Sequence, residues 1–220
     1  KPYYNQFCKR PCFHDEYLQT FNNPNVELVN TDGKGLEEIS ENGIVFEGKE
    51  YEVDCIIFAT GFEVGTDYSR RAGYQIHGSD GLTVSQKWGD GLSTFHGMHS
   101  RGFPNSFFFG PAQSGFTATY TYSLDEQSIH LAYILKKAKE QGATRIEASA
   151  EAEEKWINTI IEKARLTATF QENCTPGYYN NEGKVNQTPQ NNTYGGGPIE
   201  FFSLMKKWRT KDNLEGLELS

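Results

Sequence analysis

Apolar residues along the chain fall into short groups separated by glycine, proline and asparagine, and each group predicts a strand or a helix. The most compact group, residues 55–59, is rich in β-branched and aromatic side chains and stops at Thr60-Gly61. Such a run is typical of a strand buried on both faces inside a parallel sheet. Open α/β sheets bind ligands at the carboxyl ends of their strands, and glycine there lets the backbone approach a flat or phosphorylated group. The run therefore predicts either a plain core strand or the edge of a cofactor site.

The remaining short groups predict further β structure. Residues 36–52 are expected to form antiparallel hairpins, with turns at 41–43 and 47–49, because Asn-Gly and Glu-Gly separate apolar runs there. Other predicted strands cover residues 26–29, 74–76, 82–84, 94–98 and 106–109. The last of these also stops at a glycine, Gly110, which gives a second strand of the same form.

Longer periodic patterns predict helices, so the fold class is α/β. A short helix is expected at residues 15–21 and a long one at 120–141, closed by Gly142. Ser149 is a good N-cap for a third helix with one apolar face, and a last helix is expected at 199–210. Residues 171–198 are rich in Asn, Gly, Thr, Tyr and Gln, which predicts a long functional or disordered loop.

Composition narrows the class of protein. The chain has 220 residues, 36% hydrophobic content and a net charge of −8, so it can form a core and is a poor ligand for nucleic acid. Its apolar runs are too short for a membrane span, and its polar start does not resemble a signal peptide. The four scattered cysteines suit a reducing cytoplasm better than a disulfide scaffold, and a metal site is not expected.

Few residues carry recognisable chemistry. Lys9-Arg10 next to a proline suits an anion such as a phosphate or a peroxide, although an ordinary solvated pair has the same composition. The five histidines form no catalytic or metal-ligating pattern and are expected to be structural or exposed. A Gly-x-Gly-x-x-Gly fingerprint is absent from the sequence, so a complete dinucleotide-binding unit is not expected.

Four stretches in order resemble the C-terminal portion of flavin-dependent Baeyer–Villiger monooxygenases. They are Cys-Lys-Arg-Pro-Cys at 8–12, residues 17–29, residues 51–62 ending in Ala-Thr-Gly-Phe, and residues 102–111 with Gly-Phe-Pro-Asn and Phe-Gly-Pro. The order of the later helices also matches, so the resemblance covers nearly the whole chain. Ala-Thr-Gly-Phe alone is shared by many flavoproteins, whereas the ordered set is more specific.

The resemblance implies a fold with two Rossmann-like domains that bind FAD and NADPH. Residues 1–60 would be the last part of the NADPH-binding domain, and residues 61–220 the second half of the FAD-binding domain. The loop at 171–198 would contact NADP. The glycine-rich motifs of the family are missing, so the chain is expected to be a fragment that lacks an N-terminal part and is inactive alone.

Roles carry over from the family by position. Arg10 matches the catalytic arginine, which stabilises the flavin C4a-peroxide anion and its adduct with the ketone. Lys9 matches the residue near the 2′-phosphate of NADPH. The other matching positions are Thr60, Gly61 and Phe62 along the flavin, Tyr120 near its ring system, and Ser114, Gly115 and Phe116 in the substrate pocket.

Two positions depart from the family pattern. Glu63 stands where Asp is commoner, and Cys174 or Thr175 stands where several members place a tryptophan that reaches NADP. Residues 174–181 resemble a subgroup acting on bulky ketones. The implied reaction uses FAD, NADPH and O₂ to convert a ketone to an ester or lactone in the cytoplasm. Two alternatives stay open, namely a related flavin monooxygenase that oxidises nitrogen or sulfur, and a non-catalytic fragment that binds no flavin alone.

Overall fold

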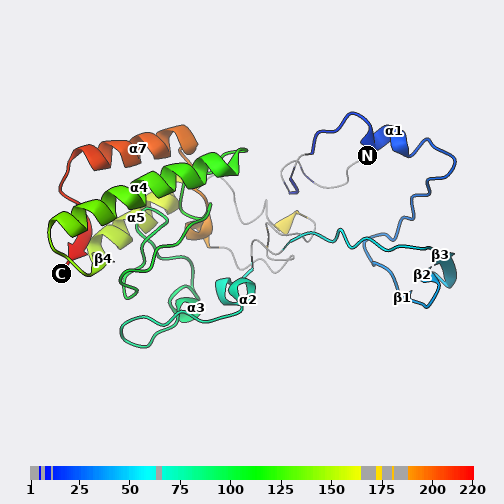
Figure 1. Ribbon diagram of the computed structural model, residues 1–220, viewed down its shortest axis with the longest axis horizontal. Helices are drawn as coiled ribbons and strands as arrows, with labels where there is room; N and C mark the ends of the chain where they lie inside the picture. Colours follow the sequence, from blue (N-terminus) through cyan, green and yellow to red (C-terminus); the bar gives the residue numbers. More distant parts are fainter. Residues whose placement is uncertain are drawn as a thin grey trace. The chain divides into compact units, whose positions relative to one another are not determined.

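A computed structural model describes residues 5, 8–10, 12–62, 66–164, 172–174, 180 and 188–220. The chain divides into two compact units (Figure 1). Unit 1 comprises residues 1–8 and 63–220, and unit 2 comprises residues 9–62. Unit 2 is therefore an excursion of the chain that leaves unit 1 after residue 8 and returns at residue 63.

Unit 2 contains the short helix α1 (Tyr17–Thr20) and one antiparallel sheet of order β1-β2-β3. Its strands are β1 (Glu38–Ile39), β2 (Gly43–Phe46) and β3 (Lys49–Glu52). Glu47 and Gly48 join β2 to β3 with φ of 49° and 73°, the left-handed pair that a two-residue hairpin turn requires. The predicted hairpins and the helix near residues 15–21 are confirmed.

Unit 1 is organised around three helices, α4 (Tyr120–Glu140), α5 (Ala150–Lys163) and α7 (Pro198–Thr210), and α4 packs directly on α7 (Figure 1). Ser149 caps α5 by accepting a hydrogen bond from the Ala152 N–H at 3.1 Å. Gly142 follows α4 with φ of 71°, and Pro198 begins α7. The three predicted helices are confirmed.

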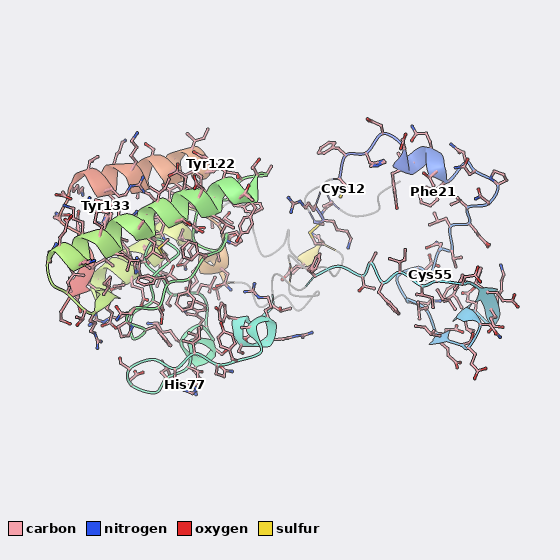
Figure 2. All side chains as sticks on the ribbon, viewed as in Figure 1. Cys12, Phe21, Cys55, His77, Tyr122 and Tyr133 are labelled. Carbon is pink, nitrogen blue, oxygen red and sulfur yellow. A yellow bond between two sulfur atoms is a disulfide. The ribbon has the colours of Figure 1, made fainter. Side chains whose placement is uncertain are left out.

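Side chains of α4 point at α7 and help to hold the pair together (Figure 2). The Tyr122 ring meets the Phe202 ring edge-on at 5.4 Å, and the Tyr133 hydroxyl donates to Asp212 at 2.7 Å. A two-stranded antiparallel sheet, β4 (Ile146–Ala148) with β5 (Leu217–Leu219), packs against the same core as the helices. The buried core lies between these elements and consists of Phe95, Ile134, Ala138, Ile146, Ala148, Trp156, Ile160, Tyr194, Phe201, Phe202, Met205, Trp208 and Leu214.

A smaller apolar cluster includes residues of two short helices, α2 (Tyr68–Ala72) and α3 (Val84–Lys87). Its buried members are Val84, Phe103 and Phe108, against which Tyr68, Ile76 and Trp88 pack. A capping box starts α3, because the Thr83 side chain and the Gln86 side chain each bond the other residue's backbone N–H.

Six predicted strands are wrong. Residues 74–76 and 82–84 form no strand: His77 and Thr83 make only an isolated bridge, and Val84 already begins α3. Residues 26–29 and 55–59 have no regular structure, and Ile57 and Phe58 are 83% and 68% exposed. The sheets of the described residues are β1–β3 and β4–β5, so residues 55–59 have no neighbouring strand with which to pair. Residues 94–98 form a tight turn instead of a strand, since His96 and Gly97 have φ of 57° and 71°, and residues 106–109 are irregular.

Candidate functional site

The segment between Gly110 and α4 contains the predicted pocket residues, beginning with Ser114. Its side chain is fully buried, and its hydroxyl donates to the Gly110 carbonyl at 2.5 Å. The Ser114 carbonyl accepts from the Tyr194 N–H at 3.0 Å, and Gln127 of α4 also donates to Gly110 at 3.0 Å. These bonds fix the backbone of the segment between α4 and the residues that precede α7.

Gly115 lets this segment lie directly against α7. A Cβ atom at Gly115 would come within 2.8 Å of Cδ1 and 3.1 Å of Cβ of Phe201, which is itself 2% exposed. Real Cβ atoms do not approach a ring so closely, and Phe201 has no room to move in the core. Only glycine therefore fits at position 115. This close packing fixes the position of the backbone at the next residue, Phe116.

Phe116 and Tyr120 form an aromatic pair beside the start of α4. Their ring centroids are 6.3 Å apart, and Phe116 is 38% exposed. Burial raises the pKa of Tyr120, while the positive charge of Arg71 acts in the opposite direction, so its hydroxyl stays protonated at neutral pH. The first turn of α4 has no side-chain cap and no acidic residue. A flat ligand with partial negative charge suits such a surface.

Gln113, just before the predicted pocket residues, connects three segments of unit 1. Its side chain is fully buried, and its amide donates to the carbonyls of Leu92 at 2.7 Å and Gln190 at 2.9 Å. Its backbone carbonyl accepts from the Trp156 indole N–H at 3.1 Å. The sequence analysis missed this residue because a glutamine in a polar loop gives no signal of burial.

Two buried carboxylates hold the Gly-Phe-Pro-Asn segment. Glu153 accepts from Lys87 at 2.9 Å and from the Arg101 N–H at 2.8 Å, and Glu147 accepts from the Gly102 N–H at 2.7 Å. Burial acts to raise the pKa of Glu147, but bonds from Arg145 and Gly102 outweigh it and lower the pKa. Both carboxylates therefore have a structural role, because their hydrogen bonds hold this segment in place.

Three histidines are buried in the core of unit 1. His96 stacks on Phe95 at 3.7 Å between ring centroids and meets the His130 ring at 5.5 Å, while His99 meets Phe107. Burial lowers the pKa of each, to about 4 for His99 and about 3 for His130. The structural role predicted for the histidines therefore fits these three, which are neutral at physiological pH.

The remaining predicted site residues lie in unit 2. Lys9 is half-buried and Arg10 is exposed, and Thr60, Gly61 and Phe62 follow the irregular residues 55–59 on the surface of this unit. Gly61 has φ of 98°, a conformation that other residues rarely adopt. The structure thus brings Ser114, Gly115, Phe116 and Tyr120 together in unit 1, and the other five belong to unit 2.

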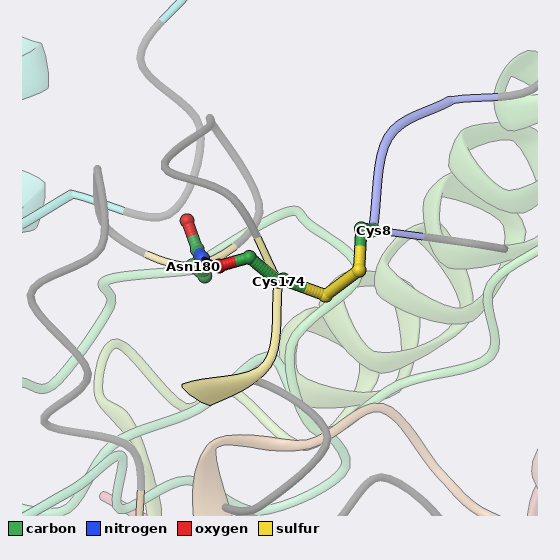
Figure 3. The surroundings of a disulfide bond; sticks show 3 residues. All are labelled: Cys8, Cys174 and Asn180. Atoms are coloured by element: carbon green, nitrogen blue, oxygen red, sulfur yellow. Dashed lines mark hydrogen bonds between the residues drawn. A yellow bond between two sulfur atoms is a disulfide. The ribbon is translucent and has the colours of Figure 1, made fainter. Parts of the chain in front are cut away.

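A disulfide joins Cys8 to Cys174 in unit 1 (Figure 3). The scattered cysteines were expected to suit a reducing cytoplasm better than a disulfide scaffold, and this pair departs from that expectation because folding brings residues 166 positions apart to a Cα–Cα distance of 5.2 Å. Cys12 and Cys55 are free and exposed (Figure 2). The sequence could not reveal the pairing, since spacing alone does not determine connectivity.

Comparison with known proteins finds relatives among monooxygenases. It is 49% identical to neopentalenolactone D synthase of Streptomyces avermitilis over 222 aligned residues, which cover 100% of the chain and 37% of that protein. It is 43% identical to a Baeyer–Villiger monooxygenase of Stachybotrys chlorohalonatus, covering 100% of the chain and 35% of the relative. No family model matches the sequence.

Solved structures agree with these relatives. The polycyclic ketone monooxygenase of Thermothelomyces thermophila has a TM-score of 0.87 and 35% identity, covering 99% of the chain and 36% of that structure. Cyclohexanone monooxygenase of Rhodococcus sp. Phi1, bound to NADP⁺, has a TM-score of 0.79 and 27% identity, covering 97% and 39%. The predicted α/β class and the family resemblance are confirmed. The chain is homologous to a segment of Baeyer–Villiger monooxygenases and spans a little over a third of their length.

Proposed function

We propose that this chain is the C-terminal portion of a Baeyer–Villiger monooxygenase that inserts one oxygen atom of O₂ beside a ketone carbonyl, giving an ester or a lactone. The observation that carries the proposal is homology over the whole chain, at 43% identity to a Baeyer–Villiger monooxygenase and at 49% identity to neopentalenolactone D synthase. Random similarity at 49% identity does not cover 100% of a chain of this length, and the fold agrees with a TM-score of 0.87.

The cofactors of the complete protein are FAD and NADPH. A relative from Hypomyces subiculosus is named an FAD-binding monooxygenase, and the Rhodococcus structure contains NADP⁺. When bound, these two groups would supply the hydride transfer and the activation of O₂ that the reaction needs. The uncapped start of α4 and the exposed ring of Phe116 fit the edge of a flavin, because the helix N-terminus favours partial negative charge.

Arg10 is the residue proposed to act on the reacting atoms. A guanidinium stays charged at all relevant pH values and presents a planar set of donors, so it can hold negative charge that develops on oxygen. Lys9 is a point charge suited to the 2′-phosphate of NADPH. Thr60, Gly61 and Phe62 are proposed to lie along the flavin, with Tyr120 near its ring system.

The proposed substrate is a bulky ketone. The Thermothelomyces relative is named a polycyclic ketone monooxygenase, and other relatives make pentalenolactone D. Ser114 to Phe116 are proposed to line the pocket, with the hydroxyl of Ser114 holding the backbone and the exposed part of Phe116 offering apolar contact. Residues 1–60 and 61–220 are proposed to belong to the NADPH-binding and FAD-binding domains.

The test uses the complete flavoprotein and the Arg10→Ala variant. Flavin reduction by NADPH should remain, while ester formation should fall by about 100-fold or more, as for loss of a preorganised oxyanion donor. Arg10→Lys keeps the charge but not the planar fork, and should recover only part of the activity. Ester formation by Arg10→Ala at the unaltered rate would refute the assignment.

A panel of ketones, amines and sulfides decides between reaction types. Ester products from ketones support the proposal, whereas oxidation of amines or sulfides alone would favour a nitrogen- or sulfur-oxidising monooxygenase. The isolated 220-residue chain, which carries no glycine-rich dinucleotide fingerprint, is proposed to bind no flavin alone. Yellow flavin absorption retained by the purified chain after FAD is added would contradict that part.

The cellular location is proposed to be the cytoplasm. No helix in the described part of the chain combines the length and apolarity needed to cross a bilayer. In the cytoplasm the Cys8–Cys174 disulfide would have to persist against reducing thiols, so its state in cells tests this location. Alkylation of the thiols in intact cells, followed by mass spectrometry of this peptide pair, measures the state of the bond in place.

A further inference from the structure

The Cys8–Cys174 disulfide lies at the point where the chain passes from one compact unit to the other. Cys8 is the last residue of the N-terminal part of unit 1, and Lys9 is the first residue of unit 2. Cys174 belongs to unit 1 as well. The bond therefore anchors in unit 1 the residue that directly precedes Lys9-Arg10.

Both ends of the bond are buried and locally braced. The exposed fractions of Cys8 and Cys174 are 4% and 8%. The Cys8 N–H donates to the Asn5 carbonyl at 3.1 Å, and the Asn180 side chain donates to the Cys174 carbonyl at 3.5 Å (Figure 3). A covalent bond between two such segments gives a fixed anchor, which a solvent-exposed bond between flexible ends would not.

We infer that the Cys8–Cys174 disulfide is a positioning device for the proposed reaction: it fixes the start of the Lys9-Arg10 segment on unit 1 and ties it to residues 172–174, where the Asn-rich stretch begins. The inference rests on the proposed function, because the position of Arg10 matters only if Arg10 acts on the reacting oxygen. Catalytic groups displaced by about 1 Å can lose about 100-fold in rate, so an anchor two residues away affects turnover.

The bond is made and broken by two-electron chemistry. Its formation joins two sulfurs and releases two protons and two electrons, which an oxidant such as glutathione disulfide accepts. A dithiol reverses this step: one thiolate attacks a sulfur of the bond and the second thiol closes a cyclic disulfide, which leaves two cysteine thiols. Dithiothreitol is therefore a direct probe of the tether.

The first experiment establishes the bond in solution. Iodoacetamide added to the denatured, unreduced chain should label Cys12 and Cys55 only, and prior reduction should add Cys8 and Cys174. Mass spectrometry should find the peptides of Cys8 and Cys174 linked. Labelling of all four cysteines in freshly purified protein without reduction would overturn the inference.

The second experiment measures ester formed per NADPH oxidised in the complete flavoprotein. Cys8→Ala/Cys174→Ala should lower this ratio by about 10-fold or more at equal FAD content, because flavin reduction continues while Arg10 is displaced. The matched control is Cys55→Ala, which removes an exposed cysteine outside the Cys8–Cys174 bond and should leave the ratio unchanged. A purely structural role would lower both rates in parallel, through loss of folded protein, and would overturn the inference.

Reduction of already folded protein keeps the test decisive if the double variant does not fold. In the Cys55→Ala background, dithiothreitol should lower the ratio and reoxidation should restore it. An unchanged ratio with the bond fully reduced would overturn the positioning role while unaltered protein still makes ester. Absence of ester from unaltered protein would instead refute the proposed function.

Discussion

Lowering the pH from 8 to 5 should destabilise unit 1 through its three buried histidines, His96, His99 and His130. Each has its pKa lowered, chiefly by burial. Arg209 donates to Nδ1 of His130 at 3.4 Å, so protonation of this ring would place two cations in contact. The carboxylate of Glu126 lies 4.0 Å from the same guanidinium. Among the described residues, Nδ1 of His96 and Nε2 of His99 and of His130 have no hydrogen-bond partner, so a proton there would lack an acceptor.

The sign and size follow from proton linkage. The unfolded chain binds protons near pH 6.5 while folded His99 and His130 bind them near pH 4 and 3, so the free energy of unfolding falls as the pH falls through this window. At pH 5 the unfolded histidine is almost fully charged and the folded one almost neutral, which costs about 2 kcal/mol for each residue relative to pH 8. Together they remove about 4 kcal/mol, a large share of a typical stability of about 5–15 kcal/mol.

Urea denaturation followed by tryptophan fluorescence measures this effect, since Trp156 and Trp208 pack against His96 at 5.1 and 5.5 Å. His130→Gln removes one titrating group and should shrink the loss between pH 8 and pH 5 by about 2 kcal/mol. The matched control is His77→Gln at an exposed position, which should leave the loss unchanged. An equal pH-dependent loss in His130→Gln and the unaltered chain would refute the reasoning.

Three further predictions concern stability, each measured by urea denaturation. Removing the disulfide by double alanine substitution should cost about 5 kcal/mol in the chain-entropy model, because the cysteines are 166 positions apart, and equal midpoints with and without the bond would contradict this. Gly115→Ala should cost about 1–3 kcal/mol through overlap with Phe201, whereas Gly110→Ala, where a Cβ meets nothing within 4 Å, should not. Ser149→Ala should cost about 1 kcal/mol by removing the cap of α5, and Ser149→Thr should retain most of it.

The helices were predictable because their signals are local. The N-cap at Ser149, the glycine after α4 and the proline that begins α7 each act within one turn of the chain. The hairpin at Glu47-Gly48 was predictable for the same reason. The capping box of α3 was also present in the sequence at Thr83 and Gln86, but the apolar pattern around it favoured a strand.

Strands that depend on distant partners were not predictable from composition. Residues 55–59 have the β-branched and aromatic side chains of a buried strand, but a strand forms only beside another strand. The described sheets offer no such neighbour, so these side chains are exposed. At residues 94–98, two consecutive left-handed residues reverse the chain, and only the glycine of the pair gives a sequence signal.

The site was partly predictable, through resemblance rather than through pattern. Gly115 was named as a pocket residue, but its contact with Phe201 depends on the packing of α7 and could not be read from the sequence. Gln113 and the Cys8–Cys174 bond join segments that are far apart in the chain, which no local signal reveals. The roles of Lys9 and Arg10 stay predictions.

The excursion of unit 2 out of unit 1 sets an order for events during synthesis. Residues 9–62 contain all three strands of their sheet, so this unit can fold soon after it leaves the ribosome. Cys8 must wait for its partner 166 positions later, which takes roughly 8–30 s at about 5–20 residues per second. During that interval Cys8 is a thiol four residues from another, Cys12, so a nascent chain in an oxidising environment can form the wrong pair. We expect the yield of native protein to depend on an isomerase or a reductant present during translation.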